Sequence, residues 1–248
     1  GDVLPWCEDN RADVAVAELQ ALAAIGPELA EYLPDFRRRL APGRPTRSIP
    51  SGDRERVAAA RDRCLACLEV RDGMPAQLAS LLDDARSAVR ERALELLAAK
   101  RLDQTKDAEV LRRIAGAVTA EHPASPGPED LSVRIRTRAA RILVSHLGND
   151  ADLRFTCASA LLLGGTADER RWANQQLVRD GKPRVQDLVW QGLFLDDPAA
   201  VIASLDLLCA LRPKPDRFRM QLRLLAEGRN RDVAARAQAA QRELGLAR

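Results

Sequence analysis

Cysteine, histidine and carboxylate side chains could support chemistry in this chain, but their spacing does not assemble a metal or catalytic site. Cys64 and Cys67 are the one close pair among five cysteines, at i and i+3 of a predicted helix. Zinc takes four ligands, and the two histidines, His122 and His146, lie in other segments. The odd cysteine count and the lack of a framework spacing predict reduced, buried thiols in a cytoplasmic protein, with no metal or cofactor.

Catalytic motifs are absent from the sequence. It contains no GxxxxGK[ST] phosphate loop, no GxSxG elbow and no HExxH helix. The adjacent carboxylates Asp83-Asp84 and Asp196-Asp197 fall in predicted turns, where aspartate caps a helix by accepting backbone N–H groups. We therefore expect these aspartates to be structural, and the protein to be non-catalytic.

The aromatic pair Trp190 and Phe194 is a candidate binding site. At about 100° per residue, both rings fall opposite the apolar stripe of their predicted helix, which consists of Val185, Leu188, Val189 and Gly192. Two aromatic rings away from the core stripe could anchor a partner protein, although packing against a neighbouring helix would also explain them. Trp172, on the preceding predicted helix, is expected to border the same region.

Arginines form a second candidate surface. Five of them lie on predicted helices that come second in their pairs: Arg112, Arg154, Arg184, Arg219 and Arg223. Aligned along one side of the protein, their guanidinium groups could contact phosphates. However, 39 basic residues face 36 acidic ones, for a net charge of +3, which favours a mixed, solvated surface over a nucleic-acid footprint.

Helical periodicity runs through nearly the whole sequence and predicts an all-α protein. Prolines fall at expected first turns and glycines at expected helix ends. Two segments rich in Pro, Gly and Ser, 41–52 and 122–128, are expected to be exposed loops. No apolar run is long enough to span a membrane, and no signal peptide is visible. The expected helices cover 11–25, 28–40, 53–70, 75–82, 87–100, 107–121, 129–147, 151–163, 167–179, 184–195, 198–211, 215–227 and 230–245.

An internal repeat organises these helices. A shift of 144 residues places Leu78, Leu81, Val89 and Ala93 on Leu222, Leu225, Val233 and Ala237. The opening Val-Arg-x-x-Ala of residues 89–93 recurs as Ile-Arg-x-x-Ala at 135–139, and in a looser form at 153–157. Several anchor residues are 32 positions apart (57 and 89, 153 and 185, 201 and 233). A period near 32 with two helices in each period predicts stacked antiparallel helix pairs.

The stretch LLDDARSAVRERA, at residues 81–93, resembles the short bacterial form of the HEAT repeat, of the phycobilisome-lyase-like type. In that family a helix ends in two leucines, an Asp-rich turn follows, and Val-Arg-x-x-Ala opens the next helix. The resemblance implies a right-handed α-solenoid of about six helix pairs plus a terminal helix, in a single domain over residues 1–248. HEAT-like di-iron hydroxylases carry His-Glu pairs as metal ligands, and this sequence has none.

Three functional hypotheses follow from this architecture. The first is a binding or scaffold module that holds a protein or peptide on its surface. The alternative is an enzyme resembling the HEAT-like alkylpurine DNA glycosylases, with Asp187, Trp190 and Trp172 as the nearest candidates for its groove. In the third, the expected terminal helix 230–245 is covered by a longer chain or by an oligomer, because it lacks the polar outer face of a capping repeat.

Overall fold

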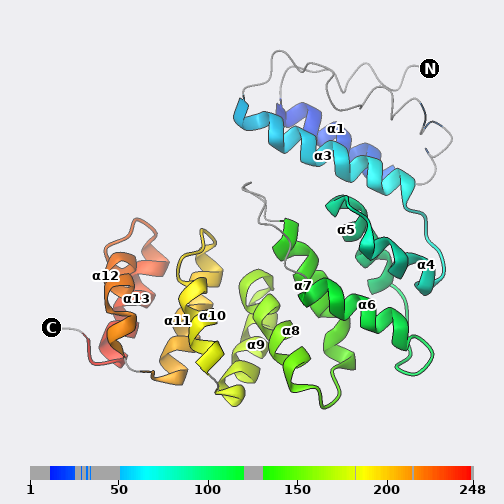
Figure 1. Ribbon diagram of the computed structural model, residues 1–248. Helices are drawn as coiled ribbons and strands as arrows, with labels where there is room; N and C mark the ends of the chain where they lie inside the picture. The colour runs from blue at the N-terminus through cyan, green and yellow to red at the C-terminus, as the bar shows by residue number, and fades with distance from the viewer. Residues whose placement is uncertain are drawn as a thin grey trace. The chain divides into compact units, whose positions relative to one another are not determined.

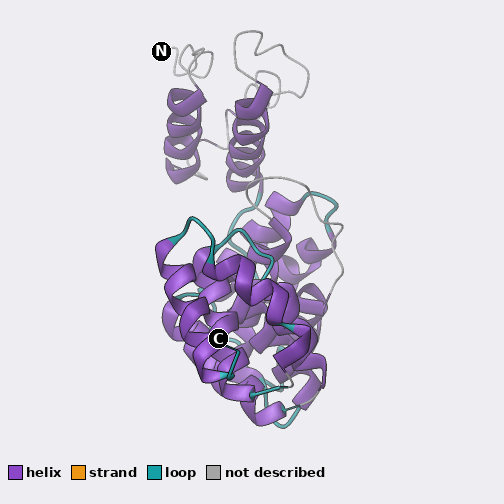
Figure 2. Cartoon of the chain, turned by 90° about the vertical axis from the view of Figure 1, so that its left-hand side faces the viewer, coloured by secondary structure: helices purple, strands orange, loops and turns teal. Residues whose placement is uncertain are grey.

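The computed structural model describes residues 12–25, 29, 32, 34, 51–119, 131–181, 183–213 and 215–246. All regular secondary structure in these residues is helical, without a strand (Figures 1 and 2). The all-α prediction is therefore confirmed. The expected helix 28–40 and the expected loops 41–52 and 122–128 lie largely outside the described residues, although Ser51 already begins a helix.

The described residues form two compact units, and the division runs through two helices, α6 (Ala108–Thr119) and α7 (Leu131–Leu143). The first unit extends to Arg113 and includes α7 up to Ile135. The second unit contains the rest of α6 and everything from Arg136 onward. The single repeat domain expected over 1–248 stays a prediction.

In the first unit, α1 (Ala12–Ile25) packs against α3 (Ser51–Glu69). The shorter α4 (Pro75–Ser80) and a 3₁₀ turn at Leu81–Asp83 pack on α5 (Ser87–Ala98), which also contacts α3. The α1–α3 core consists of apolar side chains at helical spacing, so that burying both stripes removes them from water together. Its buried members are Val16, Leu19, Leu22, Ala60, Cys64 and Leu68.

The second unit has two rows of helices. One row contains α9 (Ala167–Asp180), α11 (Pro198–Leu211) and α13 (Arg231–Glu243), which pack side by side. The other contains α8 (Ala151–Gly164), α10 (Pro183–Gly192) and α12 (Arg219–Ala226). Each helix of the second row packs on its neighbour in the first, as α8 on α9, α10 on α11 and α12 on α13 (Figure 1). Helices adjacent in a row are therefore alternate helices in the sequence.

The repeated motif residues lie where this packing is tightest. Ala93, Ala139 and Ala237 are all fully buried, as are Ile135 and Val185. A small side chain at a buried helix position lets the neighbouring helix approach closely, which is the role expected for these alanines. Helices α10 and α11 also approach closely, since a Cβ added to Gly192 would clash with Ser204 Oγ.

Helix ends are capped as the sequence predicts. Thr166 and Glu169 form the expected capping box, with Glu169 Oε2 accepting from Thr166 N at 2.7 Å. Gly181 ends α9 in the left-handed conformation at φ +59°. Asp197 caps α11 by accepting from Ala199 N at 3.0 Å. The prediction that the Asp196-Asp197 turn is structural is therefore confirmed for Asp197.

The turn aspartates and first-turn arginines of the repeat motif also have structural contacts. Arg90 donates to the carbonyl oxygen of Asp84 at 2.6 Å, and Asp83 Oδ2 accepts from Arg113 at 2.7 Å. Asp84 Oδ1 accepts from the backbone N–H of Arg86, and this hydrogen bond lowers the pKa of its carboxyl group. These side chains tie a helix end to its neighbours, as expected.

One expected helix is divided by the tertiary structure. Residues 215–227 form a 3₁₀ turn at Pro215–Arg217 followed by α12 from Arg219, with Phe218 between them. Phe218 is fully buried, so its side chain is part of the core. The break places Arg217 beside α10, which matters for the candidate site.

Candidate interaction surface

Trp190 is the centre of an aromatic cluster that links the core to the surface of the second unit. Its ring centroid lies 5.0 Å from that of Phe194, edge to face, and 5.9 Å from that of Phe218. Phe218 is fully buried, Trp190 is half-buried and Phe194 is 56% exposed. Val185, Leu188, Val189 and Gly192 are buried, as predicted, and the two rings lie together; however, α10 ends at Gly192, so Phe194 belongs to the turn after the helix and not to the helix expected over 184–195.

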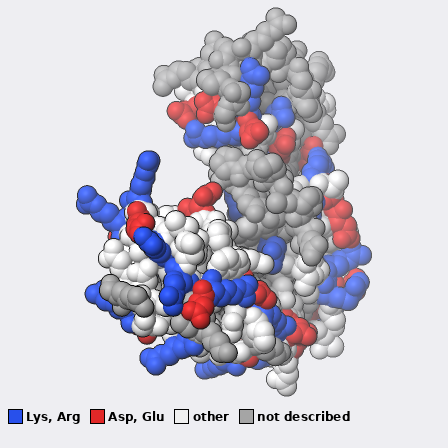
Figure 3. Space-filling view, turned by 60° about the vertical axis from the view of Figure 1, so that its left-hand side comes forward, with Lys and Arg blue, Asp and Glu red and all other residues white. Residues whose placement is uncertain are grey.

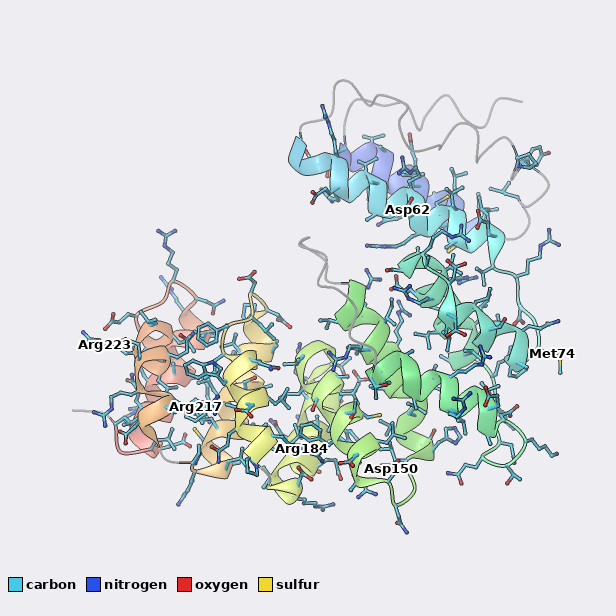
Figure 4. All side chains as sticks on the ribbon, viewed as in Figure 1. Asp62, Met74, Asp150, Arg184, Arg217 and Arg223 are labelled. Atoms are coloured by element: carbon cyan, nitrogen blue, oxygen red, sulfur yellow. The ribbon has the colours of Figure 1, made fainter. Side chains whose placement is uncertain are left out.

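Arg217 contacts two rings of the aromatic cluster, those of Trp190 and Phe218. Its guanidinium carbon lies 5.5 Å from the Trp190 ring centroid and 5.9 Å from that of Phe218. Arg217, labelled in Figure 4, also donates from Nη1 to Asp187 Oδ1, at 2.8 Å. A cation over an aromatic face contributes about 0.5–1 kcal/mol at an exposed site. The ion pair and the ring contact together restrict the rotamer of Trp190.

The same arrangement occurs between the two preceding helices of that row. Arg184, in the first turn of α10, lies 3.8 Å from the centroid of Phe155 and donates to Asp152 Oδ1 at 2.7 Å. The hydrogen bond that Arg184 donates to Asp152, together with those it donates to Asp180, raises the pKa of the Arg184 guanidinium. Both cases use an Asp-x-x-aromatic sequence on one helix and an arginine from the next helix in the row. The Asp-x-x-aromatic spacing is visible in the sequence and could have predicted both contacts.

Four of the five arginines expected to form a stripe have an acidic partner, Arg184 among them. Arg219 pairs with Asp216 at 3.1 Å, and Arg223 pairs with Glu227 at 3.0 Å. Arg154 donates to the carbonyl oxygen of Gly148 at 2.6 Å. Arg112, in the first unit, pairs with Glu109 at 2.7 Å. Basic and acidic side chains are interspersed on the face drawn in Figure 3, which is the pattern of a mixed, solvated surface.

Exposed apolar side chains lie on α12 and in the loop after α10. Eight large hydrophobic residues of the described part are exposed, and four of them lie here. We name these four the apolar surface: Phe194 (56% exposed), Leu195 (37%), Met220 (70%) and Leu224 (56%). Of these four residues, only Phe194 was predicted from the sequence as a binding residue. The i, i+4 spacing of Met220 and Leu224 could have indicated the rest.

Trp172 lies on α9, in the other row of helices, and is half-buried. It takes part in none of the ring contacts found among the described residues. The contacts that define the aromatic cluster come from α10 and the start of α12.

Cysteines do not form a reactive centre in the described residues. Cys64 is fully buried and Cys67 is half-buried, and burial raises the pKa of the Cys67 thiol. Burial also raises the pKa of Cys157 to about 12 and that of Cys209 to about 11. In the described ranges no three His, Cys, Asp or Glu side chains are grouped so as to hold a metal ion.

None of the helices in the described ranges combines the length and the apolar composition that crossing a membrane requires. Comparison with known protein families, with curated proteins and with solved structures yields no match for this chain. Functional inference therefore rests on the geometry of the site.

Proposed function

We propose that this chain is a helical-repeat binding module, an α-solenoid of HEAT-like type, that holds a partner protein on the apolar surface of α10 and α12. The alternation of rows in the second unit supports the solenoid arrangement, because α8, α10 and α12 each pack on the helix that follows in sequence, and α9, α11 and α13 pack side by side. The exposure of Phe194, in the turn after α10, and of Met220 and Leu224, on α12, is the observation that carries the binding proposal.

The geometry suits recognition because the surface is preorganised. Trp190 is restrained by Phe218 beneath it and by Arg217, which is itself bound to Asp187. A ring held in one rotamer loses little entropy when a partner covers it. Exposed Phe194 and Leu224 supply the apolar contact that the centre of a protein interface requires, and the paired arginines around them supply a polar rim.

The same contacts do not favour the glycosylase alternative. Asp187, its candidate carboxylate, is already bound by Arg217 at 2.8 Å. A catalytic carboxylate must be within hydrogen-bond reach of a substrate, and this ion pair occupies the Asp187 oxygen.

The test is affinity capture with the full chain, followed by binding measurements with the captured protein after purification. The variant Phe194→Ala/Leu224→Gln is compared with wild type and with Met74→Gln, which changes a 68% exposed residue of the first unit. We expect the double variant to lose at least tenfold in affinity, because central interface anchors contribute 2 kcal/mol or more. Met74→Gln should bind as wild type does.

Equal binding by all three proteins would refute the surface. Fluorescence anisotropy with a labelled DNA duplex at about 50 mM and about 200 mM salt checks the alternative. Specific, salt-dependent duplex binding that is lost on Arg219→Glu/Arg223→Glu substitution would replace the proposal with nucleic-acid recognition.

A further inference from the structure

A groove separate from the apolar surface runs between α9 and α11. It is open to solvent, has a volume of about 740 Å³ and is lined by side chains of these two helices alone. The helices are bridged where Asn174 Nδ2 donates to the carbonyl oxygen of Ala203 at 3.3 Å, and where Arg170 Nη2 donates to Asp197, the N-cap of α11, at 2.6 Å. The groove therefore belongs to a pair of helices in direct contact, within one unit.

Small residues account for the groove. Ala199, Ala203 and Ala210 line it from α11, where longer side chains would fill the space. Val178, which is 40% exposed, and the half-buried Ile202 add aliphatic walls. Burying an aliphatic side chain in this apolar groove contributes a favourable free energy of about 25 cal/mol for each Å² of apolar surface removed from water.

The charge available at the groove is positive. Two of its charged residues are committed elsewhere: Arg170 binds Asp197 at 2.6 Å, and Asp206 binds Arg236 at 2.5 Å. Two others remain available.

Arg171 is exposed, and its ion pair among the described residues is with Asp168 of its own helix, at 3.2 Å with both side chains more than 70% exposed. Such an exposed pair contributes little and exchanges readily. Arg179 is exposed, and among the described residues no hydrogen bond or ion pair engages it. The two arginines are eight residues apart, or about 12 Å along the helix axis.

We propose that the α9–α11 groove binds an acidic, aliphatic segment of a partner protein. An aliphatic side chain of the segment packs against the alanines that line the groove from α11. Two carboxylates of the segment, about 12 Å apart, bind Arg171 and Arg179. The apolar lining of the groove favours a peptide over a nucleic acid. Among the described residues that line the groove there is no aromatic ring for base stacking, and no cation is available besides Arg171 and Arg179. This proposal adds a second protein-binding surface, independent of α10 and α12.

Selection of a random peptide library on the immobilised full chain tests the chemistry directly. We expect enriched peptides that combine Asp or Glu with Leu, Ile or Val. A fluorescent copy of the most enriched peptide then gives dissociation constants by anisotropy. Arg171→Glu/Arg179→Glu and the groove-filling Ala210→Leu should each weaken binding at least tenfold, and binding should fall as salt rises.

The matched control is Arg219→Glu/Arg223→Glu, which makes the same charge change on α12, outside the groove. It should bind the peptide as wild type does, and so should Phe194→Ala/Leu224→Gln. Circular dichroism confirms that each variant is folded. A failure of the apolar surface on α10 and α12 would thus leave this proposal standing, and the reverse also holds.

Three outcomes would overturn the proposal: no enrichment or enrichment of non-acidic peptides, binding that survives both groove variants, and equal loss in the α12 control. A labelled single-stranded oligonucleotide that binds through Arg171 and Arg179 more tightly than the peptide would also overturn it, and would assign the groove to phosphates.

Discussion

Substituting Gly192 by alanine should weaken the contact between α10 and α11. The added Cβ would lie 2.1 Å from Ser204 Oγ and 3.0 Å from Ser204 Cβ, with Leu163 Cδ2 at 3.6 Å. Ser204 is fully buried, and its hydroxyl donates to the carbonyl oxygen of Ala200 at 2.9 Å. The hydroxyl can rotate away only by giving up this bond, and the Cβ can move only if the two helices separate.

The expected change in the free energy of unfolding for Gly192→Ala is the difference between two opposing contributions. Overpacking a buried contact costs about 1–3 kcal/mol, and alanine recovers up to about 1 kcal/mol through its higher helix propensity. We expect a net loss of about 1–2 kcal/mol in the free energy of unfolding. At about 2–4 °C per kcal/mol for a protein of this size, the midpoint of thermal unfolding should fall by several degrees.

Urea unfolding followed by circular dichroism measures this loss, with Gly116→Ala as the matched control. Gly116 lies in α6, is exposed, and has no atom within 4 Å of an added Cβ. The same substitution there should stabilise the protein by about 0.4–1 kcal/mol. A Gly192→Ala protein as stable as the Gly116→Ala protein would refute the close approach of α10 and α11.

A double-mutant cycle with Ser204 separates packing from propensity. Ser204→Ala removes the Oγ that lies nearest the added Cβ but leaves the 3.0 Å Cβ contact. We therefore expect the Gly192→Ala/Ser204→Ala protein to recover part of the loss, with a coupling energy on the order of 1 kcal/mol. A coupling energy near zero would show that the two residues do not touch.

Three further predictions concern single side chains. Arg170→Met should lower the free energy of unfolding, measured by urea titration, by about 2–4 kcal/mol. The reason is that the largely buried guanidinium binds Asp197 and the carbonyl oxygens of Leu162 and Leu163 near the end of α8. A loss below about 0.5 kcal/mol would contradict this role. Gly181→Ala should cost about 1–2 kcal/mol by the same measurement, because φ is +59° there, and an unchanged midpoint would argue against the left-handed cap. The thiols of Cys157 and Cys209, with pKa values of about 12 and 11, should stay unreactive towards a disulfide reagent at pH 8 until the protein unfolds. Since these pKa values lie above the ordinary 9.0, stability should fall as pH rises from about 9 towards 12, and a flat alkaline profile together with fast thiol reaction would contradict the burial of both groups.

Local sequence signals predicted the helices well because they act within one turn. Pro75, Pro183 and Pro198 each begin a helix, and Thr166 with Glu169 begins α9. These effects need no tertiary partner, since a first-turn proline or a capping hydroxyl acts on backbone groups at most three or four residues away.

Side-chain exposure on α12 could not be predicted in the same way. Gln221 is buried, whereas Met220 and Leu224 beside it are exposed. The reason is a contact outside the helix: Gln221 Nε2 donates to the carbonyl oxygen of Leu193, at the end of α10, at 3.0 Å. A hydrogen bond to a carbonyl 28 residues away reverses the order that hydrophobicity alone suggests.

By itself, therefore, the sequence determined that this chain is helical, where most helices begin and end, and that valine, arginine and alanine recur at helix starts. Only the tertiary structure decided which arginines meet which carboxylates, as Arg217 meets Asp187 and Arg184 meets Asp152, about thirty residues apart. It also decided that α9 and α11 leave a groove between them. The physical reason is that helix propensity and capping depend on neighbours along the chain, whereas ion pairs, exposed patches and grooves depend on which helices pack together.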